Sequence, residues 1–284
     1  MIKRLALGLA CVIFLNACSS IPGMHKSPAD KLGWKLGCQA WTFRKMTLTE
    51  TLTTLNGLGI HYIEIYPGQK FSPEKGAVIF DHNASDDLVA EFLAKCKAAD
   101  VKPVSYGVVQ LGKDEAQARK VFNFGKKLGL WNIVSEPPQE ALPMLDTLAN
   151  EYGINVAIHD HPKPSPYWDC KVVREAIRGR SPRIGACADV GHWYRSGMVP
   201  VDCLKMLDGH IIEFHFKDID TKKEDVPWGT GECNVPAMLG EIKKQKFHGL
   251  MSIEYETGEG DALLVNVRKC IEYFNAQADR LSKE

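Results

Sequence analysis

Residues 184–216 read IGACADVGHWYRSGMVPVDCLKMLDGHIIEFHF, and this stretch decides the fold. A short apolar segment, 184–189, ends in an aspartate, and a helical pattern over 200–208 stops at Gly209. A second, largely apolar segment then covers 210–216. Strands that are buried on both faces show near-continuous apolar runs, and a helix between two of them is typical of a parallel β-α-β crossover. The stretch therefore predicts two parallel strands joined by a helix.

The same alternation of short apolar segments and longer helical patterns runs through the rest of the chain. We predict strands at 35–41, 60–65, 102–108, 131–135, 154–159, 184–189, 210–216 and 249–254. We predict helices at 47–58, 85–99, 113–128, 138–152, 169–179, 200–208, 235–246 and 261–277. Consecutive units without a long linker favour a single-domain (β/α)8 TIM barrel over residues 34–284. The alternative is a doubly wound open sheet, which would more naturally end after about five or six strands.

The composition excludes several classes of protein. With 45% hydrophobic and 25% charged residues, the 284-residue chain has an average globular composition, which excludes a disordered chain, a collagen-like repeat and a polytopic membrane protein. The 35 basic and 35 acidic side chains balance, whereas a nucleic-acid-binding protein normally shows a strongly basic face. We therefore expect a small-molecule partner and no nucleic-acid partner.

The N-terminus has the pattern of an export signal. Lys3 and Arg4 precede an apolar segment at 5–15, which is too short to span a bilayer because a spanning helix needs about 20 residues. The run LNAC at 15–18 resembles the lipobox of bacterial lipoproteins, in which the cysteine is acylated and becomes the new N-terminus. The alternative is an ordinary cleavage site beside a coincidental cysteine.

This pattern predicts a lipoprotein signal peptide at 1–17, and an acylated Cys18 with a flexible tether at 18–33. The mature protein would be exported and anchored in the membrane by its lipid, facing the periplasm, and Ser19 is compatible with the outer membrane. Seven cysteines remain when Cys11 and Cys18 are set aside. They show no C-x-x-C pair, so we expect core residues rather than a cysteine metal site.

Ionisable side chains gather at the ends of the predicted strands. They are Glu64, His159, His161, Asp189, His192, His215, Lys217, Glu254 and Glu256. The carboxyl ends of TIM-barrel strands meet at one face, where active sites lie, so these groups would converge. Imidazole nitrogens and carboxylate oxygens together suit Mn²⁺, Fe²⁺, Co²⁺ or Zn²⁺. Each residue alone could instead cap a helix or form an ion pair, but their occurrence on four strands in series favours a metal site.

Three of these strand ends carry a family resemblance. The runs CADVGH at 187–192, EFHFKD at 213–218 and SIEYE at 252–256 resemble the xylose isomerase-like TIM-barrel superfamily. That superfamily contains sugar isomerases, sugar epimerases and endonuclease IV. The segment WGTGE at 228–232 is similar to its G-x-G-E loop, and the resemblance extends over about residues 35–275.

The resemblance implies one divalent metal ion held at the ends of the last four strands, without distinguishing Mn, Co, Zn, Fe and Mg. Carried over to this chain, the ligands are His159, Asp189, His215 and Glu254. The sugar 3-epimerases of the family have a glutamate where this chain has His159, and that glutamate acts as a second base. A two-base epimerisation would then need His161, Glu64 or Glu256 as its second base, whereas a one-base reaction would not.

The reaction common to the family is abstraction of a proton next to a carbonyl, with the metal stabilising the enediolate. Glu254 is the candidate base, because it is a ligand whose second oxygen can face the substrate. The resemblance implies that His192 contacts the sugar, and we expect His192 and Lys217 to donate hydrogen bonds to substrate oxygens as further catalytic residues. His161 could orient another residue, act as a base or be a fifth ligand. Substrate contacts would come from Glu64 and Glu256, and from three tryptophans that could stack on a sugar, Trp41, Trp193 and Trp228.

An exported chain without a Gly-rich phosphate loop or an arginine cluster favours a non-phosphorylated sugar, an oxidised sugar or a glycoside as substrate. We therefore expect a metal-dependent carbohydrate isomerase or epimerase. The alternatives are a 3-keto-glycoside lyase or 3-keto-2-hydroxyglucal hydratase on the same scaffold, and a non-catalytic carbohydrate-binding lipoprotein. A nuclease like endonuclease IV would need three zinc ions and a basic groove.

Overall fold

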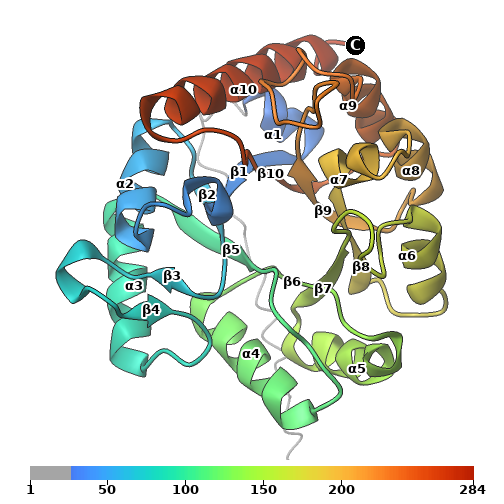
Figure 1. Cartoon of the computed structure of the whole chain (residues 1–284). Coiled ribbons are helices and arrows are strands. Elements are labelled where there is room, and N and C mark those ends of the chain that lie inside the picture. The colour runs from blue at the N-terminus through green and yellow to red at the C-terminus, as the bar shows by residue number, and fades with distance from the viewer. Residues whose placement is uncertain (1–26) are drawn as a thin grey trace, which may run out of the picture.

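The computed structural model describes residues 27–284, which form a closed barrel of parallel strands surrounded by helices (Figure 1). The barrel strands are β1 (Trp34–Gln39), β2 (Tyr62–Ile65), β5 (Lys102–Tyr106), β6 (Asn132–Ser135), β7 (Asn155–His159), β8 (Ile184–Asp189), β9 (Ile211–Phe216) and β10 (Gly249–Ile253). Their order around the barrel is β1-β10-β9-β8-β7-β6-β5-β2, and neighbouring strands are parallel. The predicted single-domain (β/α)8 TIM barrel is confirmed. The predicted signal peptide and Cys18 lie outside the described residues.

The helices are α1 (Pro28–Leu32), α2 (Leu48–Gly57), α3 (Asp86–Ala98), α4 (Glu115–Leu128), α5 (Leu142–Tyr152), α6 (Cys170–Ala176), α7 (Val190–Arg195), α8 (Pro200–Met206), α9 (Val235–Lys244) and α10 (Gly260–Leu281). Short 3-10 turns cover Ala40–Phe43, Pro73–Lys75 and Gln139–Ala141, and a hairpin of β3 (Gln69–Lys70) and β4 (Ile79–Phe80) follows β2. Local sequence explains the helix ends. Thr47 and Glu50 form a capping box at the start of α2, and Gly129 ends α4 in the left-handed conformation.

Two helices differ from the prediction. Residues 28–32, which we assigned to the flexible tether, form α1, because Ser27 caps this helix and Gly33 ends it with a left-handed residue. Helix α1 contacts α10 and so belongs to the folded domain. Helix α7 begins directly after β8 and had no counterpart among the predicted helices. It forms because the Asp189 carboxylate accepts a hydrogen bond from the backbone N–H of His192 at 2.8 Å.

Apolar side chains fill the space between the barrel and its helices. The barrel strands also bury several polar side chains. The buried polar side chains include Glu64, Ser105, Asn132, Glu213 and His215. Glu213 accepts hydrogen bonds from Ser105 at 3.0 Å and from Asn132 at 2.5 Å, so its carboxylate is satisfied inside the barrel. No helix within residues 27–284 is both long enough and apolar enough to cross a membrane.

Candidate metal centre

Four neighbouring strand ends bring together the side chains that the sequence analysis proposed as metal ligands. His159 ends β7, Asp189 ends β8, His215 lies on β9, and Glu254 follows β10. Each offers a nitrogen or oxygen atom, and these atoms all lie within 4.8 Å of one another in a buried position. The convergence follows from the topology, because these four strands are consecutive around the barrel.

Two buried nitrogen atoms at this point have no hydrogen-bond partner. They are Nε2 of His159 and Nδ1 of His215. Nε2 of His159 lies 3.6 Å from Oδ2 of Asp189, and Nδ1 of His215 lies 3.1 Å from Oε2 of Glu254. An unsatisfied buried polar atom costs about 1–3 kcal/mol, and a divalent cation would satisfy both nitrogens. Two imidazoles and two carboxylates are a donor set that suits Zn²⁺, Mn²⁺, Fe²⁺ or Co²⁺, so the residues fit a metal ion.

A second carboxylate stands behind each imidazole and fixes its orientation. Oε2 of Glu64 lies 2.7 Å from Nε2 of His215, and Oε1 of Glu136 lies 3.4 Å from Nδ1 of His159. In the metal-bound protein each outer nitrogen would carry the proton, which would leave the lone pair of the inner nitrogen for the metal ion. Burial alone would lower the pKa of His159, but Asp189 and Glu136 outweigh burial and raise it. Glu64, predicted as a substrate contact, thus serves His215 instead.

Lys217 occupies a different position from the one predicted. Its side chain is fully buried, and Nζ lies 2.6 Å from Oδ2 of Asp189 and 2.5 Å from Oε2 of Glu254. Burial would lower the pKa of Lys217, but these two carboxylates raise it well above its usual value. The ammonium group therefore faces the proposed ligands and does not line the cavity, whereas the sequence analysis expected it to face a substrate oxygen. Gly191 makes room for it, because a Cβ at Gly191 would lie 2.8 Å from Cβ of Lys217.

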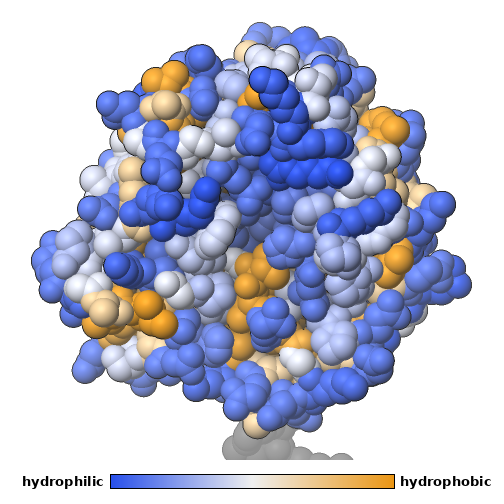
Figure 2. All heavy atoms as spheres, viewed as in Figure 1, coloured by the Kyte–Doolittle hydropathy of each residue, from blue (hydrophilic) through white to orange (hydrophobic). Residues whose placement is uncertain are grey.

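A cavity of about 360 Å³ opens above the four proposed ligands, within the range of about 300–1,000 Å³ typical of small-molecule sites. Its lining includes Trp41, Gln110, His159, His161, His192, Glu254 and Glu256. Figure 2 shows mainly hydrophilic residues around the central hollow at this end of the barrel. The described lining contains no lysine or arginine, so the cavity presents carboxylates and imidazoles to a ligand.

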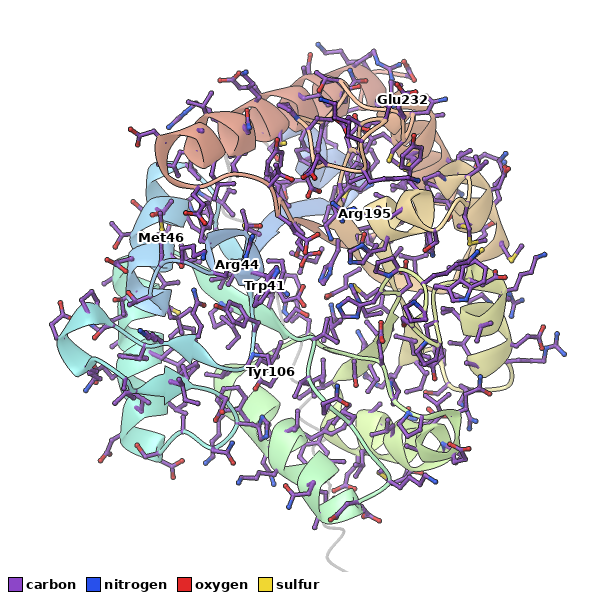
Figure 3. The ribbon with its side chains drawn as sticks, viewed as in Figure 1. Trp41, Arg44, Met46, Tyr106, Arg195 and Glu232 are labelled. Atoms are coloured by element: carbon purple, nitrogen blue, oxygen red, sulfur yellow. The ribbon has the colours of Figure 1, made fainter. Side chains whose placement is uncertain are left out.

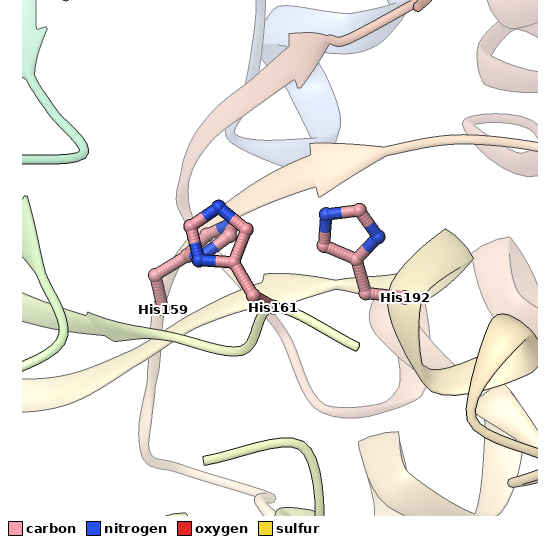
Figure 4. A group of neighbouring side chains, drawn as sticks. All are labelled: His159, His161 and His192. Atoms are coloured by element: carbon pink, nitrogen blue, oxygen red, sulfur yellow. The ribbon is translucent and has the colours of Figure 1, made fainter. Parts of the chain in front are cut away.

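Two of the lining histidines offer opposite hydrogen-bonding groups (Figure 4). Nδ1 of His161 lies 2.8 Å from Glu136, which places the proton on Nδ1 and leaves Nε2 as an acceptor. Nη1 of Arg195 lies 3.3 Å from Nδ1 of His192, which places the proton of His192 on Nε2 and makes that atom a donor. Burial holds the pKa of His192 well below its usual value, so this ring is neutral. The two rings stack with centroids 5.6 Å apart.

Arg195, the last residue of α7, joins this helix to two loops at the barrel mouth, and no sequence pattern marks this role. Its guanidinium group donates to Oδ2 of Asp225 at 2.8 Å and to Oε2 of Glu256 at 2.9 Å, besides contacting His192. Figure 3 shows Arg195 and Trp41 approaching the mouth from different parts of the barrel. Glu256 lines the cavity, and this ion pair holds its carboxylate.

Two of the three tryptophans that were predicted to contact substrate lie outside the cavity. Trp193 and Trp228 are buried in the apolar core and do not line the cavity, whereas Trp41 lines it and is 41% exposed. Trp228 packs against Phe216 with ring centroids 4.7 Å apart, because the loop that carries it folds back over β9. Asp218 holds this loop by accepting from backbone N–H groups, including that of Gly231 at 2.8 Å.

Comparison with known proteins agrees with this geometry. The sequence model of the family described as "Xylose isomerase-like TIM barrel" matches residues 138–275. An uncharacterized protein from Parabacteroides distasonis ATCC 8503 is 37% identical over 85% of this chain and 98% of that chain, with a TM-score of 0.70. The chain belongs to the xylose isomerase-like TIM-barrel family. The predicted family is thus confirmed, while export as a lipoprotein stays a prediction.

Solved structures of lower sequence identity share the fold. The IolI protein with a bound zinc atom is 20% identical over 87% of this chain and 98% of that chain, with a TM-score of 0.65. The probable 3-DHS dehydratase AsbF from Bacillus anthracis is 14% identical over 84% and 98% of the two chains, with a TM-score of 0.65. A D-psicose 3-epimerase is 14% identical over 87% and 96%, with a TM-score of 0.63. A search of curated protein sequences finds no match.

Proposed function

We propose that this family member is a divalent-metal-dependent enzyme that abstracts a proton next to the carbonyl of a non-phosphorylated sugar or sugar derivative. The observation that carries the proposal is the pair of unpartnered imidazole nitrogens, on His159 and His215, which converge with two carboxylates beneath a small-molecule cavity. A non-catalytic carbohydrate-binding barrel would not need this donor set, because sugar binding alone requires no metal ligands.

A divalent ion held by His159, Asp189, His215 and Glu254 would supply Lewis-acid stabilisation of the negative charge that develops when the proton leaves. Glu254 is the proposed base. Lys217 and His215 both contact its Oε2, which leaves Oε1 to accept the proton. Burial would raise the pKa of Glu254, but these two partners outweigh burial and lower it, so the carboxylate is ionised at neutral pH.

The other lining groups fit a neutral polyhydroxy substrate. Nε2–H of His192 would donate to a substrate oxygen, while Nε2 of His161 would accept from a hydroxyl group. Glu254 and Glu256 would repel a phosphate group, and the described lining holds no cation to compensate. These features favour a free sugar, a keto-sugar or a glycoside over a sugar phosphate.

The reaction type is proposed as isomerisation or epimerisation, with elimination or hydration on a 3-keto-glycoside as the second candidate. The second candidate is supported by the small number of side chains that could act as a base. His159 stands where the resemblance implies a glutamate in the 3-epimerases, and Glu256 is ion-paired with Arg195 at 2.9 Å. Glu254 is then the one strong base beside the reacting carbon. A lyase or hydratase for 3-keto-glycosides needs one such base.

Metal analysis and isotope exchange test the proposal together. The purified protein is expected to retain one divalent ion per chain, and incubation in D₂O with free sugars and 3-keto-glycosides should label the carbon next to the carbonyl of the true substrate. Glu254→Gln should abolish labelling, whereas Glu259→Gln, a change on the surface outside the lining, should not. A metal-free protein that binds sugars without any exchange would instead establish the non-catalytic alternative.

A further inference from the structure

The lining of the cavity above the proposed metal ligands divides into two halves of different chemistry. One half comes from the ends of β7, β8 and β10 and the segments that follow them, and it carries ionisable groups: His159, His161, His192, Glu254 and Glu256. The other half comes from the segments that follow β1, β2 and β5, and it includes the aromatic and apolar side chains of Trp41, Tyr66, Pro67 and Val108. Strands β7 to β10 are consecutive around the barrel, and so are β5, β2 and β1, so each half occupies its own side of the cavity.

Trp41 is exposed at the cavity, yet its neighbours hold it in place. It is 41% exposed, and the Tyr66 ring meets the indole at 84°, with ring centroids 5.1 Å apart. The guanidinium carbon of Arg44 lies 5.5 Å from the centroid of the indole ring, and Nη2 of Arg44 donates to the carbonyl oxygen of Glu256 at 2.9 Å (Figure 3). An aromatic surface that is exposed but already ordered loses little conformational entropy when a ligand packs on it.

The backbone around Trp41 is fixed relative to the proposed base. Trp41 and Thr42 lie in the 3-10 turn that follows β1. The hydroxyl group of Thr42 donates to the carbonyl oxygen of Ile253 at 3.3 Å and accepts from the backbone N–H of Tyr255 at 3.0 Å. Ile253 and Tyr255 flank Glu254, so the turn is hydrogen-bonded to the chain on both sides of the proposed base.

We infer that Trp41 and Tyr66 form a subsite for a second sugar ring, so that the substrate is a glycoside of two sugar units. The reacting unit would lie beside Glu254, and the second unit would pack on the indole of Trp41. Strands β1 and β10 are adjacent and about 4.8 Å apart, so these two positions are neighbours, as the two rings of a disaccharide are. The inference rests on the proposed function, because the proposed base decides which of the two units reacts.

A sugar ring suits the aromatic half better than a charged group or a purely apolar group. One face of a pyranose ring presents C–H groups that can pack on an indole, while its hydroxyl groups point outward from the ring. Gln110, on the same loop as Val108, adds an amide to the lining that can donate to and accept from such hydroxyl groups. The described lining has no lysine or arginine that would bind an anionic group.

Calorimetric titration with glycosides that cannot react tests the inference independently of catalysis. Methyl glucoside has one sugar ring, methyl maltoside and methyl cellobioside have two, and none has the carbonyl group that the proposed reaction needs. Wild type is expected to bind one of the two-ring glycosides at least about tenfold more tightly than methyl glucoside, the effect of one well-packed aromatic contact. Trp41→Ala should remove this preference and Trp41→Phe should retain most of it. Val199→Ala, which alters an exposed apolar side chain outside the lining, is the control and should leave the preference unchanged.

A second readout does not depend on how the variants fold. In ¹H–¹⁵N spectra of wild type, the indole N–H signal of Trp41 should shift when the two-ring glycoside is added, and a signal that stays in place overturns the inference. Equal affinity for one-ring and two-ring glycosides overturns it too, as do a preference that survives in Trp41→Ala, tighter binding of phenyl glucoside, and failure to bind any of these glycosides. Exchange in D₂O is measured separately with the 3-keto derivatives. A two-ring preference without exchange supports the subsite and overturns the proposed reaction.

Discussion

Glu64→Gln tests whether the carboxylate behind His215 prepares this imidazole for a metal ion. Glu64 is fully buried, and its Oε2 lies 2.7 Å from Nε2 of His215. Glutamine has nearly the same shape but no charge. Its amide can also present N–H to the ring, which would move the imidazole proton to Nδ1 and block the nitrogen that faces the other proposed ligands.

The size of the effect follows from the hydrogen bond that is changed. A hydrogen bond to a charged group contributes roughly 1.5–3 kcal/mol and a neutral one roughly 0.5–1.5 kcal/mol. The loss of about 1–1.5 kcal/mol corresponds to metal binding that is about 5- to 13-fold weaker. Substitutions of groups behind metal-bound histidines typically weaken binding by about 10- to 100-fold, so we expect a change of about tenfold.

Competition with a fluorescent zinc chelator measures this affinity, with the surface variant Glu91→Gln as control. The metal-free variant should still fold, because glutamine keeps the shape of the side chain and a neutral hydrogen bond to His215, although the weaker bond lowers the free energy of unfolding by about 1–1.5 kcal/mol. Unchanged zinc affinity in a folded Glu64→Gln variant would refute the assignment of His215 Nδ1 as a ligand atom.

Three further predictions concern other parts of the chain. Arg195→Lys keeps the charge but loses the planar guanidinium group that joins Asp225 and Glu256. KM should therefore rise roughly tenfold, and the ¹⁵N shifts of His192 should no longer report a proton fixed on Nε2. Unchanged shifts would contradict the role of Arg195 in fixing that proton. Chelation of the metal should lower Tm by roughly 5–10 °C, since an ion at 100 times its Kd contributes about 2.7 kcal/mol, and an unaltered Tm would speak against a resident ion. Cys18→Ala should abolish incorporation of labelled palmitate and release the protein from the membrane fraction, and labelling that persists would rule out Cys18 as the acylated residue.

The barrel was predictable because its strands are short, apolar and regularly spaced, and because glycines such as Gly129 mark helix ends. The predictions failed where one residue decides the local structure through a contact. Helix α7 depends on the Asp189 carboxylate capping the backbone of His192, and α1 depends on Ser27 and Gly33. Such short elements lack the apolar periodicity from which longer helices are recognised.

The position of the four proposed ligands was predictable for a related reason, since parallel strands of one barrel end at the same face. The partners of these ligands were not. Glu136 and Arg195 act through contacts 25 and 61 residues away in sequence, with His161 and Glu256, and no local pattern marks either. Trp193 and Trp228 are close to strand ends in sequence, but proximity to a strand end does not decide whether a side chain faces the cavity or the core.

Because the ammonium group of Lys217 is buried among the proposed ligands, we expect the protein to fold before it binds a metal ion. Small zinc domains fold only when the metal binds, because metal binding supplies most of their folding free energy. Here Lys217 already supplies a positive charge beside Asp189 and Glu254, so the barrel can reach its folded state with an internal counter-ion. The identity of the bound ion would then depend on which metal ions are present around the folded protein. The same polypeptide, produced in surroundings with different metals, is expected to carry different ions at one site.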